Sequence, residues 1–194
     1  MFKNILQSFL PWILYFILMG ESQLRIDIAI VVAALTAIIF ELKGLKKGFI
    51  LSWGTLLFFI FMFIAVLVLR NQWVATHSWL FSNGALAAIA WFSILIRKPF
   101  TLQYAREQVS PDKWQHPLFL KINYLLTVVW GLVFLMGMGL HVIKFYFPGL
   151  RGAVFEAITY IPSIFAIWFT GWFPGWYRER YIRRIQKQKE NKLQ

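Results

Sequence analysis

The sequence of 194 residues contains no cysteine, which excludes a disulfide framework, a thiolate metal site and a cysteine nucleophile. Charged residues are also scarce: they make up 14% of the chain, whereas about a quarter is usual in a soluble domain. The P-loop, HExxH and GxSxG motifs do not occur. From these absences we expect no enzyme activity, no catalytic residue, no metal site and no cofactor.

Apolar residues, by contrast, make up 59% of the chain and gather in six blocks. The blocks cover residues 5–19, 26–40, 49–69, 79–96, 122–142 and 153–176. They lack the alternation of barrel strands, and backbone facing lipid must satisfy its own hydrogen bonds, so we predict helices. The predicted fold is an all-α membrane protein, a bundle of about six short transmembrane helices within residues 1–177. Residues 178–194 form a basic tail.

The first two blocks are short for membrane spans. Each has about 15 residues, or about 22 Å of helix, whereas the hydrocarbon core is about 30 Å thick. The second block carries Asp27 near its start and ends at Glu41. The two blocks are either short spans that thin the bilayer or a re-entrant hairpin, and we favour two spans.

Basic residues predict the orientation. With six crossings, sixteen of the twenty Lys and Arg residues lie on one side and four on the other. This positive-inside pattern places both termini in the cytoplasm. A re-entrant hairpin leaves the same distribution, so charge does not decide between the two alternatives. The net charge of +12 lies between and after the apolar blocks, where we expect contact with the bilayer and, at the tail, with anionic lipid, and no nucleic-acid binding.

Ionisable residues near the predicted outer face are candidates for function, because a charge in a membrane is costly. Asp27 and Glu156 lie near the starts of their blocks, and His141 lies near the end of the fifth. Together they could line a cavity of a small transporter or lipid-handling protein. Pro162 and Pro174 could then mark a broken helix beside that cavity.

These three residues also have a simpler interpretation, which we favour. Asp27 would pair with Arg25 and Glu156 with Arg151, both at headgroup depth, and His141 would pack on aromatic side chains. The polar residues inside the later blocks have a similar explanation. Asn83 and Asn123 are expected to hydrogen-bond between helices, an effect of about 1 kcal/mol each.

The longest connection, residues 97–121, is the most distinctive stretch of the chain. Lys98 is followed by Pro99, which breaks the fourth helix at the interface. We predict a short helix over residues 101–109, with Arg106 toward water. Its apolar and aromatic neighbours are expected to face lipid: Phe100, Leu102 and Tyr104. The connection is either a docking surface for a partner or anionic lipid, or an interfacial connector held by its own anchors.

Several landmarks follow one another in a fixed order along the chain. They are Phe9-Leu10-Pro11, Asp27, the basic residues within 43–47, Lys98-Pro99, Trp114, Lys121, Asn123 and Phe147-Pro148. This order resembles the intracellular septation protein A family of bacterial inner-membrane proteins, although the TLQYARE segment and the longer basic tail depart from typical members. The resemblance implies a role in cell-envelope maintenance or septation through contacts with other envelope or division proteins. It implies no catalytic residues.

The leading hypothesis is therefore a structural or interaction protein of the bacterial inner membrane. It would act through the 97–121 connection, the tail and the small-residue faces of the spans, which also permit a homo-oligomer. A transporter with an outer cavity and an accessory subunit of a larger membrane complex are the alternatives.

Overall fold

The computed structural model describes residues 5, 7–20, 22–147, 149 and 153–193, and the side chains of these except 153–157, 189, 192 and 193. The described residues form helices and no strands, which confirms the predicted all-α class. Four helices are long and apolar enough to cross a membrane. They are α3 (Gln23–Lys46), α4 with its continuation η1 (Ile50–Val68), α6 (Ser78–Leu95) and α8 (Pro117–Tyr146).

Helix α3 is longer than the apolar block that predicted it. It begins after Ser22, whose hydroxyl accepts the Arg25 N–H at 3.4 Å, and it continues through polar residues to Lys46. Its 24 residues correspond to about 36 Å of helix, which exceeds the hydrocarbon core. Gly48, with φ of +70°, then turns the chain into α4. The predicted shortness of this second span is therefore wrong, because polar residues at both ends extend the helix.

The N-terminal segment, with α2 (Leu10–Leu18), lies inside the bundle. Trp12 and Tyr15 are almost fully buried, and Trp12 Nε1 donates to Thr55 Oγ1 of α4 at 2.8 Å. The ring of Phe9 contacts Phe100, which follows α6, whereas Phe16 stacks on Trp79 at the start of α6. The segment therefore runs alongside most of α6, with its aromatic face packed on protein.

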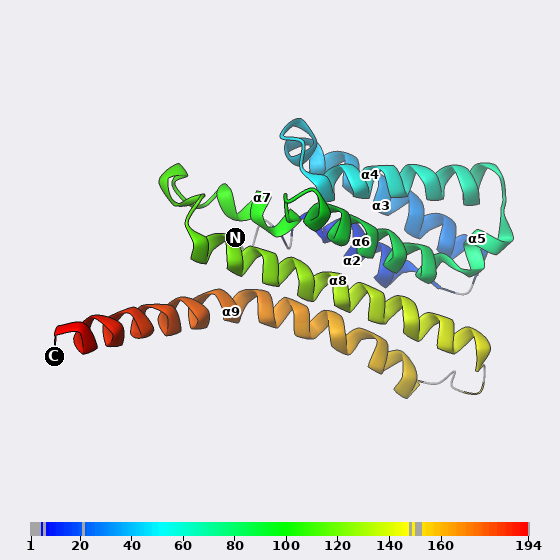
Figure 1. Cartoon of the computed structure of the whole chain (residues 1–194). Helices are drawn as coiled ribbons and strands as arrows, with labels where there is room; N and C mark the ends of the chain where they lie inside the picture. Colours follow the sequence, from blue (N-terminus) through cyan, green and yellow to red (C-terminus); the bar gives the residue numbers. More distant parts are fainter. Residues whose placement is uncertain (1–4, 6, 21, 148, 150–152, 194) are drawn as a thin grey trace.

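The connections gather at two ends of the bundle (Figure 1). The turn between α3 and α4 and the short helix α7 (Phe100–Arg106) lie toward one end, which we call the inner end. Helix α5 (Gln72–Thr76) and the connection from α8 to α9 lie at the opposite, outer end. Helix α9 (Ala153–Leu193) packs along α8 and extends beyond the inner end as a single helix.

The position of α7 contradicts the sequence prediction. The helix is confined to Phe100–Arg106, and Phe100, Leu102 and Tyr104 are buried in the bundle where we had expected them to face lipid. Hydroxyl groups make this possible, because they satisfy polar atoms around the segment. The Phe100 N–H donates to Ser93 Oγ at 3.1 Å, and Thr101 Oγ1 donates to the Asn123 carbonyl at 2.8 Å.

The Trp12–Thr55 contact gives a direct test of the central position of α2. We expect Thr55→Val to lower the free energy of unfolding by about 1–3 kcal/mol, because it leaves a buried indole N–H without an acceptor. Thermal unfolding of the purified protein in detergent measures this change. The exposed Thr76→Val is the matched control and should unfold like the unmodified protein. Equal unfolding temperatures for the two variants would contradict the assigned packing.

Candidate functional site

A buried polar cluster lies at the inner end of the bundle. Its centre is Glu41 of α3, which is only 1% exposed. Ser52 of α4, Tyr104 of α7 and Ser8 of the N-terminal segment are buried around it. The cluster thus joins the N-terminal segment, α3, α4 and α7.

The carboxylate of Glu41 has two different environments. One oxygen, Oε2, accepts a hydrogen bond from the Ser52 hydroxyl, and Ser52 Oγ lies 3.3 Å from the Tyr104 hydroxyl oxygen. Ser8 interacts with both Glu41 and Tyr104. The other oxygen, Oε1, is buried without a hydrogen-bond partner. An unsatisfied buried carboxylate oxygen is unusual and indicates a functional or protonated group.

The turn between α3 and α4 holds these groups together. Gln103 of α7 accepts the Ile50 N–H through its side-chain oxygen at 2.9 Å, at the start of α4. The ring of Phe49 packs edge-on against Tyr104, and Lys47 forms an ion pair with Glu107 at the surface. Together these contacts fix α7 against the turn. They make the inner end a packed surface in which Tyr104 is inaccessible to a partner.

The electrostatic environment determines which groups of the cluster can donate hydrogen bonds and which are without a countercharge. Burial raises the pKa of the Tyr104 phenol, so the phenol stays protonated and its O–H is a donor. Among the described residues, no lysine or arginine forms an ion pair with Glu41. The same residues contain no group of three or more histidines and carboxylates that could hold a metal ion. The arrangement can accept or donate a proton through adjoining oxygen atoms.

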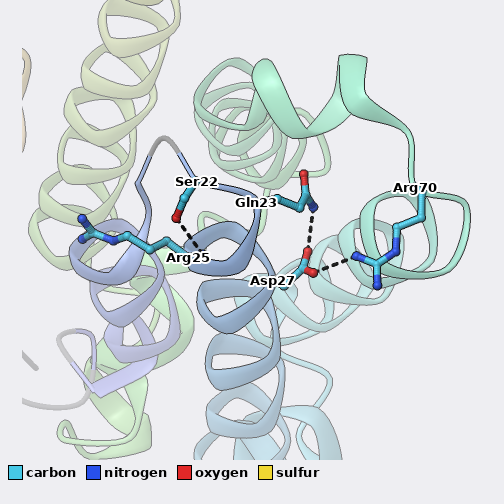
Figure 2. A network of polar contacts seen from close by, with 5 residues as sticks. All are labelled: Ser22, Gln23, Arg25, Asp27 and Arg70. Atoms are coloured by element: carbon cyan, nitrogen blue, oxygen red, sulfur yellow. Dashed lines mark hydrogen bonds and ion pairs between the residues drawn. The ribbon is translucent and has the colours of Figure 1, made fainter.

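Asp27 lies near the other end of α3 and belongs to a separate network (Figure 2). Its Oδ1 accepts from Gln23 Nε2 at 2.7 Å, and its Oδ2 pairs with Arg70 at 2.7 Å. Arg25, the predicted partner, points away from Asp27 and donates to the Leu18 carbonyl at 3.4 Å. The predicted pairing of Asp27 with Arg25 is therefore wrong, and the partner of Asp27 is Arg70. The reason is that Arg70 approaches from the η1–α5 connection, which the sequence does not place.

His141 is not among the hydrogen-bond or ion-pair partners of Asp27. His141 is partly buried in α8, near the end whose Phe145 packs on His77. Glu156 lies in α9, and its side chain is outside the described residues. Pro162 and Pro174 lie within a continuous α9, so the broken helix is not present.

Two hollows in the described part of the bundle are apolar. One is a cavity of about 90 Å³ lined mainly by aromatic residues of the N-terminal segment and α8, with Leu86 of α6 and Thr170 of α9. The other is a groove of about 500 Å³ between α4 and α6, lined by Gly54, Gly84 and apolar side chains. Neither is lined by Asp27 or His141. The predicted outer cavity therefore finds no counterpart in these two hollows.

The predicted inner candidates are held by local contacts. Lys98 is exposed and Pro99 is buried, whereas the Arg106 guanidinium lies over the Trp114 ring, 5.4 Å from its centroid. The Asn123 side chain donates to the Phe119 carbonyl of its own helix at 2.8 Å, and its backbone carbonyl makes the contact with Thr101. The predicted interhelical bond of Asn123 is thus made by its backbone carbonyl and not by its amide group.

Sequence reasoning missed Glu41 as a candidate. It treated Glu41 as the polar end of the second block. Glu41 and Gly44, which are three residues apart, lie on the same face of a helix. A Cβ added to Gly44 would overlap the Ser52 hydroxyl, so glycine is required there. That signal is too weak to interpret without the neighbouring helix.

Comparison with protein-family models, with curated proteins and with solved structures finds no match for this chain. Its function is therefore inferred from its own contacts and from the order of its sequence landmarks.

Gly44 provides a test of the cluster. We expect Gly44→Ala to lower the unfolding temperature, because the added methyl group must displace Ser52 from Glu41. Gly139→Ala in α8 is the matched control, since no atom lies within 4 Å of the added Cβ. That variant should be as stable as the unmodified protein or slightly more stable. Thermal unfolding in detergent measures both, and a neutral Gly44→Ala would contradict the close packing.

Proposed function

We propose that this chain is a multi-pass protein of the bacterial inner (cytoplasmic) membrane that crosses it six times, with both termini in the cytoplasm. The length of α3 and the contacts of Phe9 and Phe16 near opposite ends of α6 support two full N-terminal spans. Exposed basic residues at or next to the inner end support its cytoplasmic assignment. They include Lys43, Lys46, Lys47, Arg97 and Lys98.

The proposed role is that of a structural interaction protein in cell-envelope maintenance or septation, without catalysis. The observation that carries it is the continuation of α9 beyond the bundle (Figure 1). Residues 177–193 add about 25 Å of helix at 1.5 Å per residue. Every basic residue of this extension whose side chain is described is exposed: Arg178, Arg180, Arg183, Arg184 and Lys187. A basic helix that leaves the membrane presents charge to a partner.

The distance from the membrane indicates the kind of partner. Trp176 and Arg180 form a cation–π pair at 4.6 Å, which is typical of the interface. Arg183 and Lys187 lie about 10 and 16 Å further along the helix than Trp176. Charges are screened within about 8 Å at physiological salt, so headgroups attract the distal residues weakly. We therefore assign Arg183, Arg184 and Lys187 to an acidic surface of another envelope or division protein, and only the proximal arginines to anionic lipid.

The absence of cysteine makes the topology directly testable. In intact cells, a membrane-impermeant maleimide should label Leu24→Cys and Gln72→Cys at the outer end, and should leave Lys98→Cys unlabelled. All three positions are exposed, and Lys98→Cys should react once the cells are opened. Labelling of Gln72→Cys without Leu24→Cys would instead indicate a re-entrant hairpin.

The interaction role predicts a position-specific effect of charge. Replacing Arg183, Arg184 and Lys187 with glutamine should reduce co-purification of a membrane or division protein about tenfold, since each exposed ion pair contributes about 0.5 kcal/mol. Quantitative mass spectrometry of the tagged protein, purified from its own membranes, measures the change. The control replaces Lys43, Lys46 and Lys113, which removes the same charge from the same side. Equal recovery with both variants would contradict a role for the α9 extension.

A further inference from the structure

Glu41 is an ionisable side chain in a buried environment that disfavours its charged form. It is 1% exposed, and its Oε1 atom has no hydrogen-bond partner. Removing a carboxylate from water costs several kcal/mol unless a cation and hydrogen bonds compensate. Lys47, close to it in sequence, pairs with Glu107, and Lys43 is exposed. The buried Glu41 side chain is therefore most stable when a bound positive charge neutralises its carboxylate.

The composition and packing of the cluster indicate what neutralises it. A single carboxylate among the uncharged hydroxyls of Ser8, Ser52 and Tyr104 matches one positive charge. Glu41 and Ser52 are in direct contact, and a single methyl group on Gly44 would already overlap Ser52. Neither of the two hollows reaches Glu41. A proton fits this space, whereas a metal ion would need to separate the oxygen atoms that touch.

We propose that Glu41 is a proton-binding site, occupied when α7 is packed against α3 and α4 and emptied when α7 moves away. In the occupied state the carboxylic acid is neutral, and its O–H bond remains intact. On release, that bond breaks, its electron pair stays on the carboxylate oxygen, and the proton passes to water admitted at the inner end. Glu41 lies five residues before the end of α3, so this path is short.

The groups around Glu41 couple its protonation to α7. From α7, Tyr104 contributes a titratable group next to Glu41, and Glu107 at the end of α7 acts on Tyr104. Within the described residues, α4 and the N-terminal segment contribute Ser52 and Ser8, which are uncharged. A charged Glu41 requires water, because among the described residues no lysine or arginine forms an ion pair with it. The resulting opening detaches Tyr104 and changes the shape of the inner end. This inference does not depend on the role of the α9 extension.

Infrared spectroscopy of the full-length protein in detergent tests the proposal. At pH 7 the unmodified protein should show the C=O stretch of a protonated carboxylic acid, and Glu41→Gln should lack it. Asp27→Asn is the matched control and should retain the band, because Asp27 is paired with Arg70 and lies outside the cluster. Raising the pH should remove the band and increase amide hydrogen exchange across residues 100–106 by more than the intrinsic base-catalysed increase. In Glu41→Gln, which has no group to deprotonate at this position, exchange should rise with pH only by the intrinsic increase.

Several outcomes would contradict a proton site at Glu41. A band that is absent from the unmodified protein, or that survives Glu41→Gln, would overturn the proposal. Loss of the band on addition of sodium chloride at constant pH, but not of choline chloride, would show a sodium site instead. If Glu41→Gln does not fold, Ser52→Ala decides the matter, because loss of its hydrogen bond must shift the band frequency. An unshifted band in Ser52→Ala would assign it to another carboxyl group.

Discussion

A helix bundle in lipid contains no water to solvate its interior, so each buried N–H, O–H and carboxylate group must find a partner within the protein. In this chain, serine and threonine hydroxyls supply many of those partners. Thr55 accepts from Trp12, Thr170 accepts from Trp130 at 3.0 Å, and Ser93 accepts the Phe100 N–H. The helices can pack together because these serine and threonine hydroxyls lie next to buried indole and backbone N–H groups and accept their hydrogen bonds.

The re-entry of α7 results from this constraint. A segment with free backbone N–H and C=O groups is tolerated near the membrane only where protein satisfies them. Ser93 accepts the Phe100 N–H of this segment, the Gln103 side chain accepts the Ile50 N–H at the start of α4, and Thr101 joins the segment to α8. The inner end is therefore a packed surface that these hydrogen bonds hold in place. A partner would meet its basic rim and the α9 extension, while Tyr104 remains inside.

The two carboxylates of α3 illustrate how position decides chemistry. Asp27 has both oxygens occupied and an arginine beside it, so it stabilises the outer connections as an ion. Glu41 has a serine, a neighbouring tyrosine and one unsatisfied oxygen, with no ion pair among the described contacts. The same functional group on the same helix is thus a structural anchor at one end and a candidate proton site at the other.

Hydrophobic periodicity and length determined the helical class and the approximate positions of the four long apolar helices, because apolar blocks of this size have few alternatives in lipid. The charge distribution also predicted which connections share an end. Tertiary structure alone decided that Arg70 and not Arg25 meets Asp27, that Tyr104 is buried, and that Glu41 is enclosed. The reason is that local sequence specifies the face of a helix but not the neighbour that covers it. In a bundle where nearly every surface is apolar, only the packed positions of Ser52, Ser93 and Thr101 distinguish one neighbour from another.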